Sequence, residues 1–187
     1  TAKAKEEGAT TKFTAKDSAD AFGYMAMAGW KTEDMLNGID GIMSLAAASG
    51  EDLATTSDIV TDALTAFGLQ ASDSGHFADV LAQASANANT NVGMMGESFK
   101  YVAPVAGALK YSVEDVSLAL GLMANASVKG SMAGTSLKTS LANMAAPTDK
   151  MEAAMDKYGI SLTKRNGEMK TMHEVLDNLR SSLGGLS

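Results

Sequence analysis

The sequence predicts an all-α protein, a multi-helix bundle of short helices rich in Ala, Gly and Met, with one small β-hairpin near the C-terminus. Apolar residues recur at helical spacing along most of the chain. Only two prolines occur in 187 residues, which agrees with a high helix content because proline breaks helix interiors. Asn166-Gly167, flanked by alternating residues, is the strongest short-range hairpin signal.

Composition predicts an adaptable core and excludes several kinds of site. Hydrophobic residues make up 45% of the chain but aromatic residues only 5%, so we expect packing through small residues and flexible Met side chains. The net charge of −7 gives no electrostatic support for nucleic-acid binding. The absence of cysteine excludes disulfides, a thiol nucleophile and thiolate metal ligands. The longest uncharged run, residues 80–96, is too rich in amides and hydroxyls to span a bilayer unaided.

The first predicted helix covers residues 15–29. Phe22 and Met25 give it an apolar face at helical spacing, and Gly29 is a plausible stop. Trp30 follows that stop, and we expect it to anchor the turn rather than to bind a ligand.

The next two helices are predicted at residues 32–48 and 49–67, the second with Ser49 as its cap. Gly38 and Gly41 lie inside the first of them, where each costs about 1 kcal/mol relative to Ala. We therefore expect these glycines to let another helix approach closely.

The most apolar helix is predicted at residues 112–128, after Tyr111. Ser112 can cap its first turn, and Tyr111 can pack on Val116 as a hydrophobic staple. Its apolar residues lie on more than one face, with Val113, Val116, Leu120 and Met123 in one stripe and Leu118 and Leu122 pointing elsewhere. This pattern predicts a helix that its neighbours bury, at the centre of the core.

Three predicted helices begin with a similar short sequence motif, which we call a phrase: a capping residue, acidic residues and then an apolar residue. The phrases are Thr32-Glu-Asp-Met35, Ser49-Gly-Glu-Asp-Leu53 and Ser112-Val-Glu-Asp-Val116. A duplicated helical hairpin would explain them, but capping chemistry alone produces the same pattern. We favour capping chemistry.

Proline marks the limits of the remaining central helices. These helices are predicted at residues 72–86, 92–109 and 130–146, with a polar break at 87–91. Pro104 should kink the second of them or split it near Val102. Pro147 should end the third.

The last forty residues have a different pattern of predicted secondary structure from the rest of the chain. A short charged helix is predicted at residues 148–158, the hairpin at 160–171 and a helix at 172–183. The predicted organisation is therefore a lead-in segment from a preceding helix (1–14), a main helical domain (15–147) and a helix-hairpin-helix appendage with the start of a linker (148–187). The chain has no starting Met, and we expect it to be a segment of a longer protein.

No catalytic, cofactor or metal site is expected. His76 and His173 are far apart in the sequence and lack ligand-spaced partners. Ser161 and Lys164 match a Ser-x-x-Lys pattern, but that chemistry needs a helix and these residues lie on a predicted strand.

Two further patterns also have simpler explanations. Asp58 and Asp62 share a helix face, but nothing predicts the aromatic cleft of a glycosidase pair, and a solvated face explains them better. Asn125-Ala-Ser127 fits a glycosylation acceptor only in a secreted protein.

Several segments together resemble one known family. The segments are Gly8-Ala-Thr-Thr-Lys-Phe-Thr-Ala15, Ala28-Gly-Trp-Lys-Thr-Glu-Asp-Met35, residues 58–69, residues 99–116 and Gly130-Ser-Met-Ala-Gly-Thr-Ser-Leu137. In this order they are similar to the core region of phage tail tape-measure proteins. The resemblance runs from about Gly8 to about Leu179, although no single motif is diagnostic.

The resemblance implies a structural, non-enzymatic domain. Proteins of this family set tail length, occupy the lumen of the tail tube and leave it during DNA ejection. The implied partners are a few coaxial copies of the same protein, the tail tube protein, assembly chaperones and the baseplate hub, with assembly in the host cytoplasm and possible host-membrane contact on ejection.

Two other functions remain open from the sequence. One is a membrane-active module that enters the host envelope, binding lipid weakly at neutral pH and more strongly at about pH 4.5 to 5, where carboxylates begin to lose charge. The other is a non-catalytic part of a tail-associated peptidoglycan hydrolase.

Overall fold

The computed structural model describes residues 2–185. Within them lie ten α-helices and one 3-10 turn, so the predicted all-α class is confirmed. The helices are α1 (Ala2–Thr10), α2 (Ala15–Met27), α3 (Thr32–Ser49), α4 (Leu53–Phe67), α5 (Ser74–Ala86), α6 (Val92–Ala108), α7 (Val113–Asn125), α8 (Gly130–Ala145), α9 (Asp149–Tyr158) and α10 (Met172–Leu183), and the turn is η1 (Ala71–Asp73).

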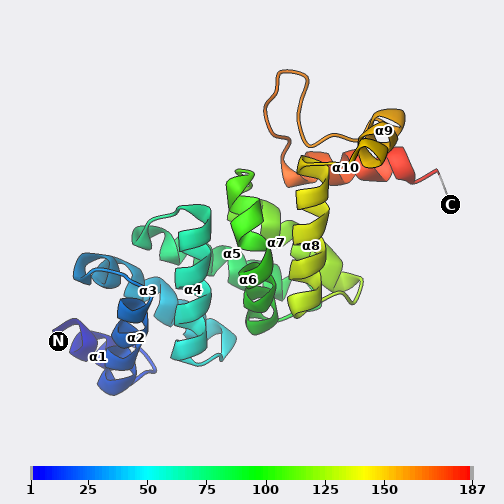
Figure 1. The fold of residues 1–187 in the computed structure, drawn as a ribbon. Helices are drawn as coiled ribbons and strands as arrows, with labels where there is room; N and C mark the ends of the chain where they lie inside the picture. The colour runs from blue at the N-terminus through cyan, green and yellow to red at the C-terminus, as the bar shows by residue number, and fades with distance from the viewer. Residues whose placement is uncertain (1, 186–187) are drawn as a thin grey trace.

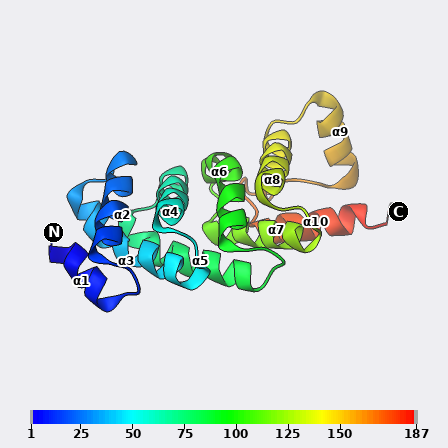
Figure 2. The ribbon, with the colours of Figure 1, turned by 90° about the horizontal axis from the view of Figure 1, so that it is seen from below.

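The helices form a two-layered array. Helices α2, α4, α6 and α8 stand side by side in chain order along the molecule (Figure 1). Helices α3, α5, α7 and α10 follow one another along the second layer (Figure 2). Helix α1 packs on α2 at one end. Each helix thus contacts its neighbours in the array instead of a shared central helix.

The core lies between the two layers. Phe99 of α6 contacts the ring of Phe77 of α5 edge-on, with ring centroids 5.6 Å apart. It also contacts Phe67 of α4 at 6.0 Å. These three aromatic rings join both layers at the middle of the array.

Three pairs of helices are joined by the same elbow. The residue at the bend has a left-handed backbone, with φ of 87° at Gly29, 68° at Gly68 and 64° at Lys110. The N–H of the following residue donates to a carbonyl of the last helical turn, as in a Schellman motif. These bonds are Trp30 to Met25 (3.0 Å), Leu69 to Leu64 (2.9 Å) and Tyr111 to Ala106 (3.0 Å).

A carboxylate closes each of these elbows. It accepts a hydrogen bond from the backbone N–H of the residue at the N-cap, three positions earlier. The donors and acceptors are Lys31 and Asp34 (3.1 Å), Gln70 and Asp73 (2.8 Å), and Ser112 and Asp115 (3.4 Å).

The burial pattern repeats with the elbows. Counted from the left-handed residue, five positions are buried in all three pairs. They are Ser18, Ala21, Met25, Gly38 and Ile39 in the first pair, Ser57, Val60, Leu64, Phe77 and Ala78 in the second, and Phe99, Val102, Ala106, Ala119 and Leu120 in the third. The array is therefore an internal repeat of one helix pair. Such repeats bury their apolar faces by stacking on neighbours.

A fourth pair, α8 and α10, is interrupted. Buried Gly134, Leu137 and Leu141 of α8 have the same spacing as Phe99, Val102 and Ala106 of α6. A Thr171–Glu174 capping box begins α10. Residues 146–171, which we call the insertion, separate the two helices and contain α9.

The repeat explains the similar helix starts only in part. The phrases at Thr32 and Ser112 both follow an elbow within a pair. The phrase at Ser49 instead links two pairs, and there Asp52 caps α4 by accepting from the N–H of Thr55 at 2.9 Å. Capping chemistry accounts for this third phrase, whereas the other two belong to the repeat.

The predicted β-hairpin is wrong. The described residues contain no strand, and residues 160–171 form a loop with a single isolated bridge between Thr163 and Met169. The Ser161 N–H donates to Oδ1 of Asn178 (3.2 Å), and the Ser161 hydroxyl donates to the carbonyl of Thr163 (2.9 Å). Because such side-chain bonds compete with ladder bonds, the two arms do not extend into strands.

The structure also corrects two expectations about individual helices, namely that α6 splits and that α7 is enclosed. Helix α6 is continuous through Pro104, so the predicted split near Val102 is not seen. Pro104 has no N–H, so the carbonyl of Lys100 lacks its helical hydrogen-bond donor. Because Lys100 and Pro104 are both exposed, water can donate to this carbonyl instead. Helix α7 is not enclosed at the centre of the core, because one of its faces is open to solvent.

The domain boundaries stay predictions. The lead-in segment contacts the array through Lys3, which pairs with Glu7 at 2.9 Å and Asp40 at 3.1 Å. At the other end, the N–H of buried Met172 donates to Oδ1 of Asp115 at 2.8 Å. Helix α10 is therefore attached to the array as well as to the insertion.

Candidate functional site

The two histidines form separate pairs with acidic side chains. Nε2 of His76 in α5 lies 2.5 Å from a carboxylate oxygen of Glu114 in α7. Nε2 of His173 lies 3.3 Å from Asp177, one turn further along α10. Among the described residues, no group of three or more His, Asp or Glu side chains is placed to hold a metal ion.

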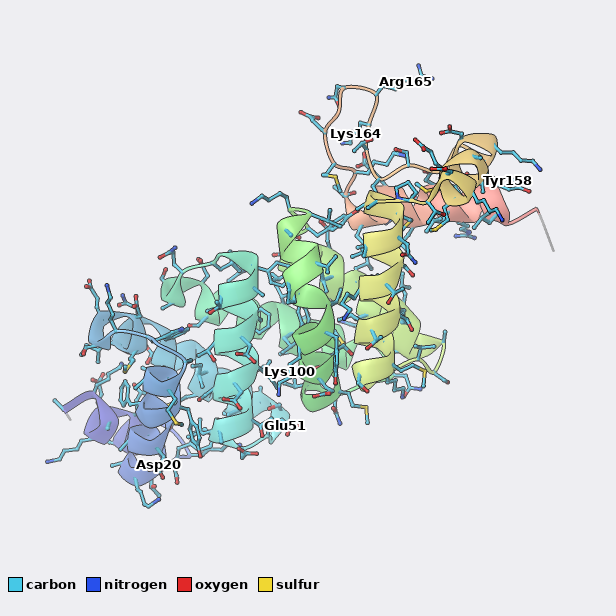
Figure 3. All side chains as sticks on the ribbon, viewed as in Figure 1. Asp20, Glu51, Lys100, Tyr158, Lys164 and Arg165 are labelled. Atoms are coloured by element: carbon cyan, nitrogen blue, oxygen red, sulfur yellow. The ribbon has the colours of Figure 1, made fainter. Side chains whose placement is uncertain are left out.

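The Ser-x-x-Lys pattern does not form a catalytic pair. The hydroxyl of Ser161 bonds to Thr163, whereas Lys164 forms an ion pair with Glu174 at 3.1 Å. Lys164 and its neighbour Arg165 lie on a loop that projects away from the layers (Figure 3).

Of the two aspartates of α4, Asp62 lines a groove between α4 and α6, whereas Asp58 is not among the lining residues. Burial raises the pKa of the Asp62 carboxyl, and the charge of Asp58 adds to this effect, while Lys100 opposes it. The aromatic side chain lining the groove is Phe99, a core residue.

Within residues 2–185, no helix combines the length and the apolar character needed to cross a membrane.

A groove lies between α5 and α7, and we call it the α5–α7 groove. Its volume is about 310 Å³. It is lined by Val80, Gln83, Ala84, Asn87 and Ala88 on one side and by Glu114, Ser117, Leu118, Gly121, Leu122 and Asn125 on the other.

The apolar wall of the groove comes from the exposed face of α7. Leu118 is 41% exposed and Leu122 is 51% exposed, whereas Val116 and Leu120 on the opposite face are buried. The two leucines lie one turn apart on one side of the helix. In the sequence these two leucines lie off the main apolar stripe, yet they are predicted to be buried, because a helix that is apolar on several faces is usually surrounded by other helices.

Small residues form the floor of the groove. A side chain added at Gly121 would meet the Cβ atom of Ala88 at 3.5 Å, an ordinary contact distance. Ser117 is buried, and its hydroxyl has no hydrogen-bond partner. The floor therefore offers little polar recognition, and the polar groups lie on the rim.

Polar contacts join the two helices near each end of the groove. His76 pairs with Glu114 near one end, and the backbone N–H of Asn89 donates to Oδ1 of Asn125 (2.8 Å) near the other. Partial burial opposes ionisation of Glu114, but hydrogen bonds from its own backbone, from Ser112 and from His76 prevail and lower its pKa. Glu114 is therefore a carboxylate at neutral pH.

The α5–α7 groove is suited to binding rather than to catalysis. Its one carboxylate, Glu114, is stabilised in the charged form, and no second titratable acid is among the lining residues. An open apolar trough with amides on its rim fits a peptide or a helix better than a reacting small molecule.

The chain matches a known protein family. The family described as "Phage-related minor tail protein" matches residues 1–187. The tape measure protein of Pneumococcus phage Dp-1 is 39% identical over 180 residues, which cover 96% of this chain and 16% of that protein. The probable tape measure protein of Escherichia phage P2 is 25% identical over 179 residues, which cover 96% of this chain and 22% of that protein.

The chain thus spans less than a quarter of the length of either relative. No solved structure matches it. Because the family match extends over the whole chain, this protein belongs to the phage-related minor tail protein family.

Proposed function

We propose that this chain is a structural segment of a phage or prophage tail tape-measure protein. The observation that carries the proposal is the similarity to the Dp-1 tape measure protein, which covers 96% of this chain. The repeated helix pairs support it, because stacked repeats build an extended scaffold without any catalytic centre.

In this proposal the full-length protein sets tail length, lies in the lumen of the tail tube in a few coaxial copies and leaves it when DNA is ejected. Its partners are the tube protein, the assembly chaperones and the baseplate hub, and assembly takes place in the host cytoplasm. The segment itself consists of the lead-in residues 1–14, the main helical domain 15–147 and the appendage 148–187.

Deletion in the complete protein tests the proposal. Residues 15–147 are removed in frame in the phage or prophage that encodes the chain, and particles are measured by electron microscopy. We expect tails to be absent or altered in length while heads still form. Normal yields of tails of unchanged length would contradict a structural role in the tape measure.

The position in the tail is tested separately. Intact purified tails are treated with protease, and the protein is followed by mass spectrometry before and after the tube is disrupted. Protection in intact tails, followed by cleavage in disrupted ones, is expected for a lumenal protein. Cleavage at the same rate in both would contradict the lumenal position.

A non-enzymatic role is part of the same proposal. Incubating the chain with purified cell-wall sacculi should release no soluble peptidoglycan fragments. Release that depends on the added protein would contradict this part of the proposal and favour a lytic function.

A further inference from the structure

We infer that the α5–α7 groove is a docking site for an amphipathic helix of a partner protein, one that carries Lys or Arg beside its apolar stripe. The inference goes beyond the proposed structural role, because it assigns a binding surface and the chemistry of the partner segment that fits it.

The shape of the groove matches helix-in-groove recognition. Such grooves hold the apolar face of a helix through anchor positions one turn apart. Leu118 and Leu122 provide one wall with this spacing, and Val80 and Ala84 provide the other from α5. Gly121 keeps the floor low between the walls.

The array itself leaves this groove open. Between α3 and α5, a side chain added at Gly41 would lie only 2.5 Å from the backbone of Ser74 and Gly75, so these helices are in close contact. Between α5 and α7, a side chain added at Gly121 would have its nearest neighbour at 3.5 Å, the Cβ atom of Ala88. The α3–α5 interface is therefore tightly packed at Gly41, whereas a groove lies between α5 and α7 beside Gly121.

The negative charge of the surface around the groove favours a positively charged partner helix. Residues 32–99 contain no Lys or Arg but ten acidic residues, namely Glu33, Asp34, Asp40, Glu51, Asp52, Asp58, Asp62, Asp73, Asp79 and Glu97.

Two carboxylates are close to the groove itself. Glu114 lines it, and exposed Asp79 lies one helical turn before the lining residue Gln83. No Lys or Arg is among the lining residues. A cationic helix is therefore attracted to this surface, and an acidic helix is repelled.

Binding of synthetic helices to the complete chain tests the inference. Three labelled peptides of about five turns are compared by fluorescence anisotropy. The first has an apolar stripe flanked by Lys, the second has the same stripe flanked by Glu, and the third has the composition of the first in scrambled order. We expect the first to bind at least about tenfold more tightly than the other two.

Variants of the chain locate the binding surface. The double variant Leu118→Ser, Leu122→Ser should weaken binding of the Lys peptide by at least about tenfold. Asp79→Asn with Glu114→Gln should weaken it by a smaller factor and reduce its dependence on salt. Met132→Ser is the matched control, because Met132 is a 63% exposed apolar side chain on α8, outside the groove, and it should leave binding unchanged.

Circular dichroism checks that each variant is folded. The inference is overturned if the scrambled peptide binds as tightly as the ordered one, which would indicate only general attraction to an acidic protein. It is equally overturned if the double leucine variant binds like the unaltered chain, or if no peptide binds at about millimolar concentration, the weak limit of specific affinity.

Discussion

The repeated pairs and the insertion both form helices, but they do so for different reasons. Helices α2 to α8 bury the same positions in pair after pair and depend on their neighbours. Helix α9 has no buried residue. It is supported locally, by Asp149 and Glu152 in its first turn, Lys157 in its last and Gly159 at its C-cap with φ of 64°. Helix content therefore does not indicate which segments hold the molecule together.

The largest expected contrast is between Leu120 and Met155. Leu120→Ala removes a fully buried side chain of the array and should cost about 2 to 3 kcal/mol, the lower part of the usual range because Ala-rich surroundings collapse partly into the space. Met155→Ala, on the half-buried face of α9, should cost less than about 1 kcal/mol. Chemical denaturation of both variants measures the contrast, and equal losses would remove the distinction between the two regions.

The contact between α6 and α8 gives the next effect. A side chain at Gly134 would meet the backbone of Ser98, so Gly134→Ala should destabilise the array by about 1 to 3 kcal/mol. Gly23 in α2 has nothing within 4 Å, and Gly23→Ala should stabilise by up to about 1 kcal/mol through helix propensity. Thermal unfolding should shift in opposite directions, and a shift in the same direction would show that the glycines do not set helix spacing.

The elbows allow a reciprocal exchange. Gly68→Ala places a side chain in a left-handed conformation and should cost about 1 kcal/mol, whereas Lys110→Gly should stabilise by a similar amount. If both changes destabilise, the two elbows are not equivalent and the repeat loses its main support.

The smallest effect concerns Tyr111, which occupies the position of Trp30 and Leu69 but has a buried hydroxyl without a partner. Burial, with a contribution from the charge of Asp115, raises the pKa of Tyr111 to about 12. The folded state thus holds this proton more tightly than the unfolded state, so its contribution to stability is complete below about pH 10 and is lost as the pH rises toward 12.

Tyr111→Phe removes that hydroxyl. It should leave stability unchanged or slightly higher at neutral pH, because no hydrogen bond is lost. It should also reduce the loss of stability between about pH 10 and 12. Denaturation curves of both proteins across this range check the prediction, and an equal loss in both would show that Tyr111 does not titrate as described.

The sequence could predict most helices because their signals are local. Caps such as Ser112, stops such as Gly68 and Gly159, and apolar spacing all act within a few residues. The prediction of a hairpin is wrong because the N–H of Ser161 donates to the side chain of Asn178, which is distant in the sequence. Asn166-Gly167 still forms a turn, in which the Gly167 N–H donates to the carbonyl of Lys164 (3.0 Å).

The α5–α7 groove could not be predicted for a related reason. In the sequence, Leu118 and Leu122 cannot be told apart from the leucines of the core. They are exposed only because α5 and α7 are separated at the groove. The repeat was also hidden, because Gly29, Gly68 and Lys110 share a backbone conformation rather than a residue type. Longer-range geometry decided each of these features.

Hydrogen exchange measured by mass spectrometry tests the central claim most directly, namely that stacked pairs carry the stability and the insertion does not. The amides of α2 to α8 should exchange slowly and unfold together with the whole molecule, while those of α9 and residues 160–170 should exchange orders of magnitude faster through local opening. Protection of α9 equal to that of α6 would contradict the account.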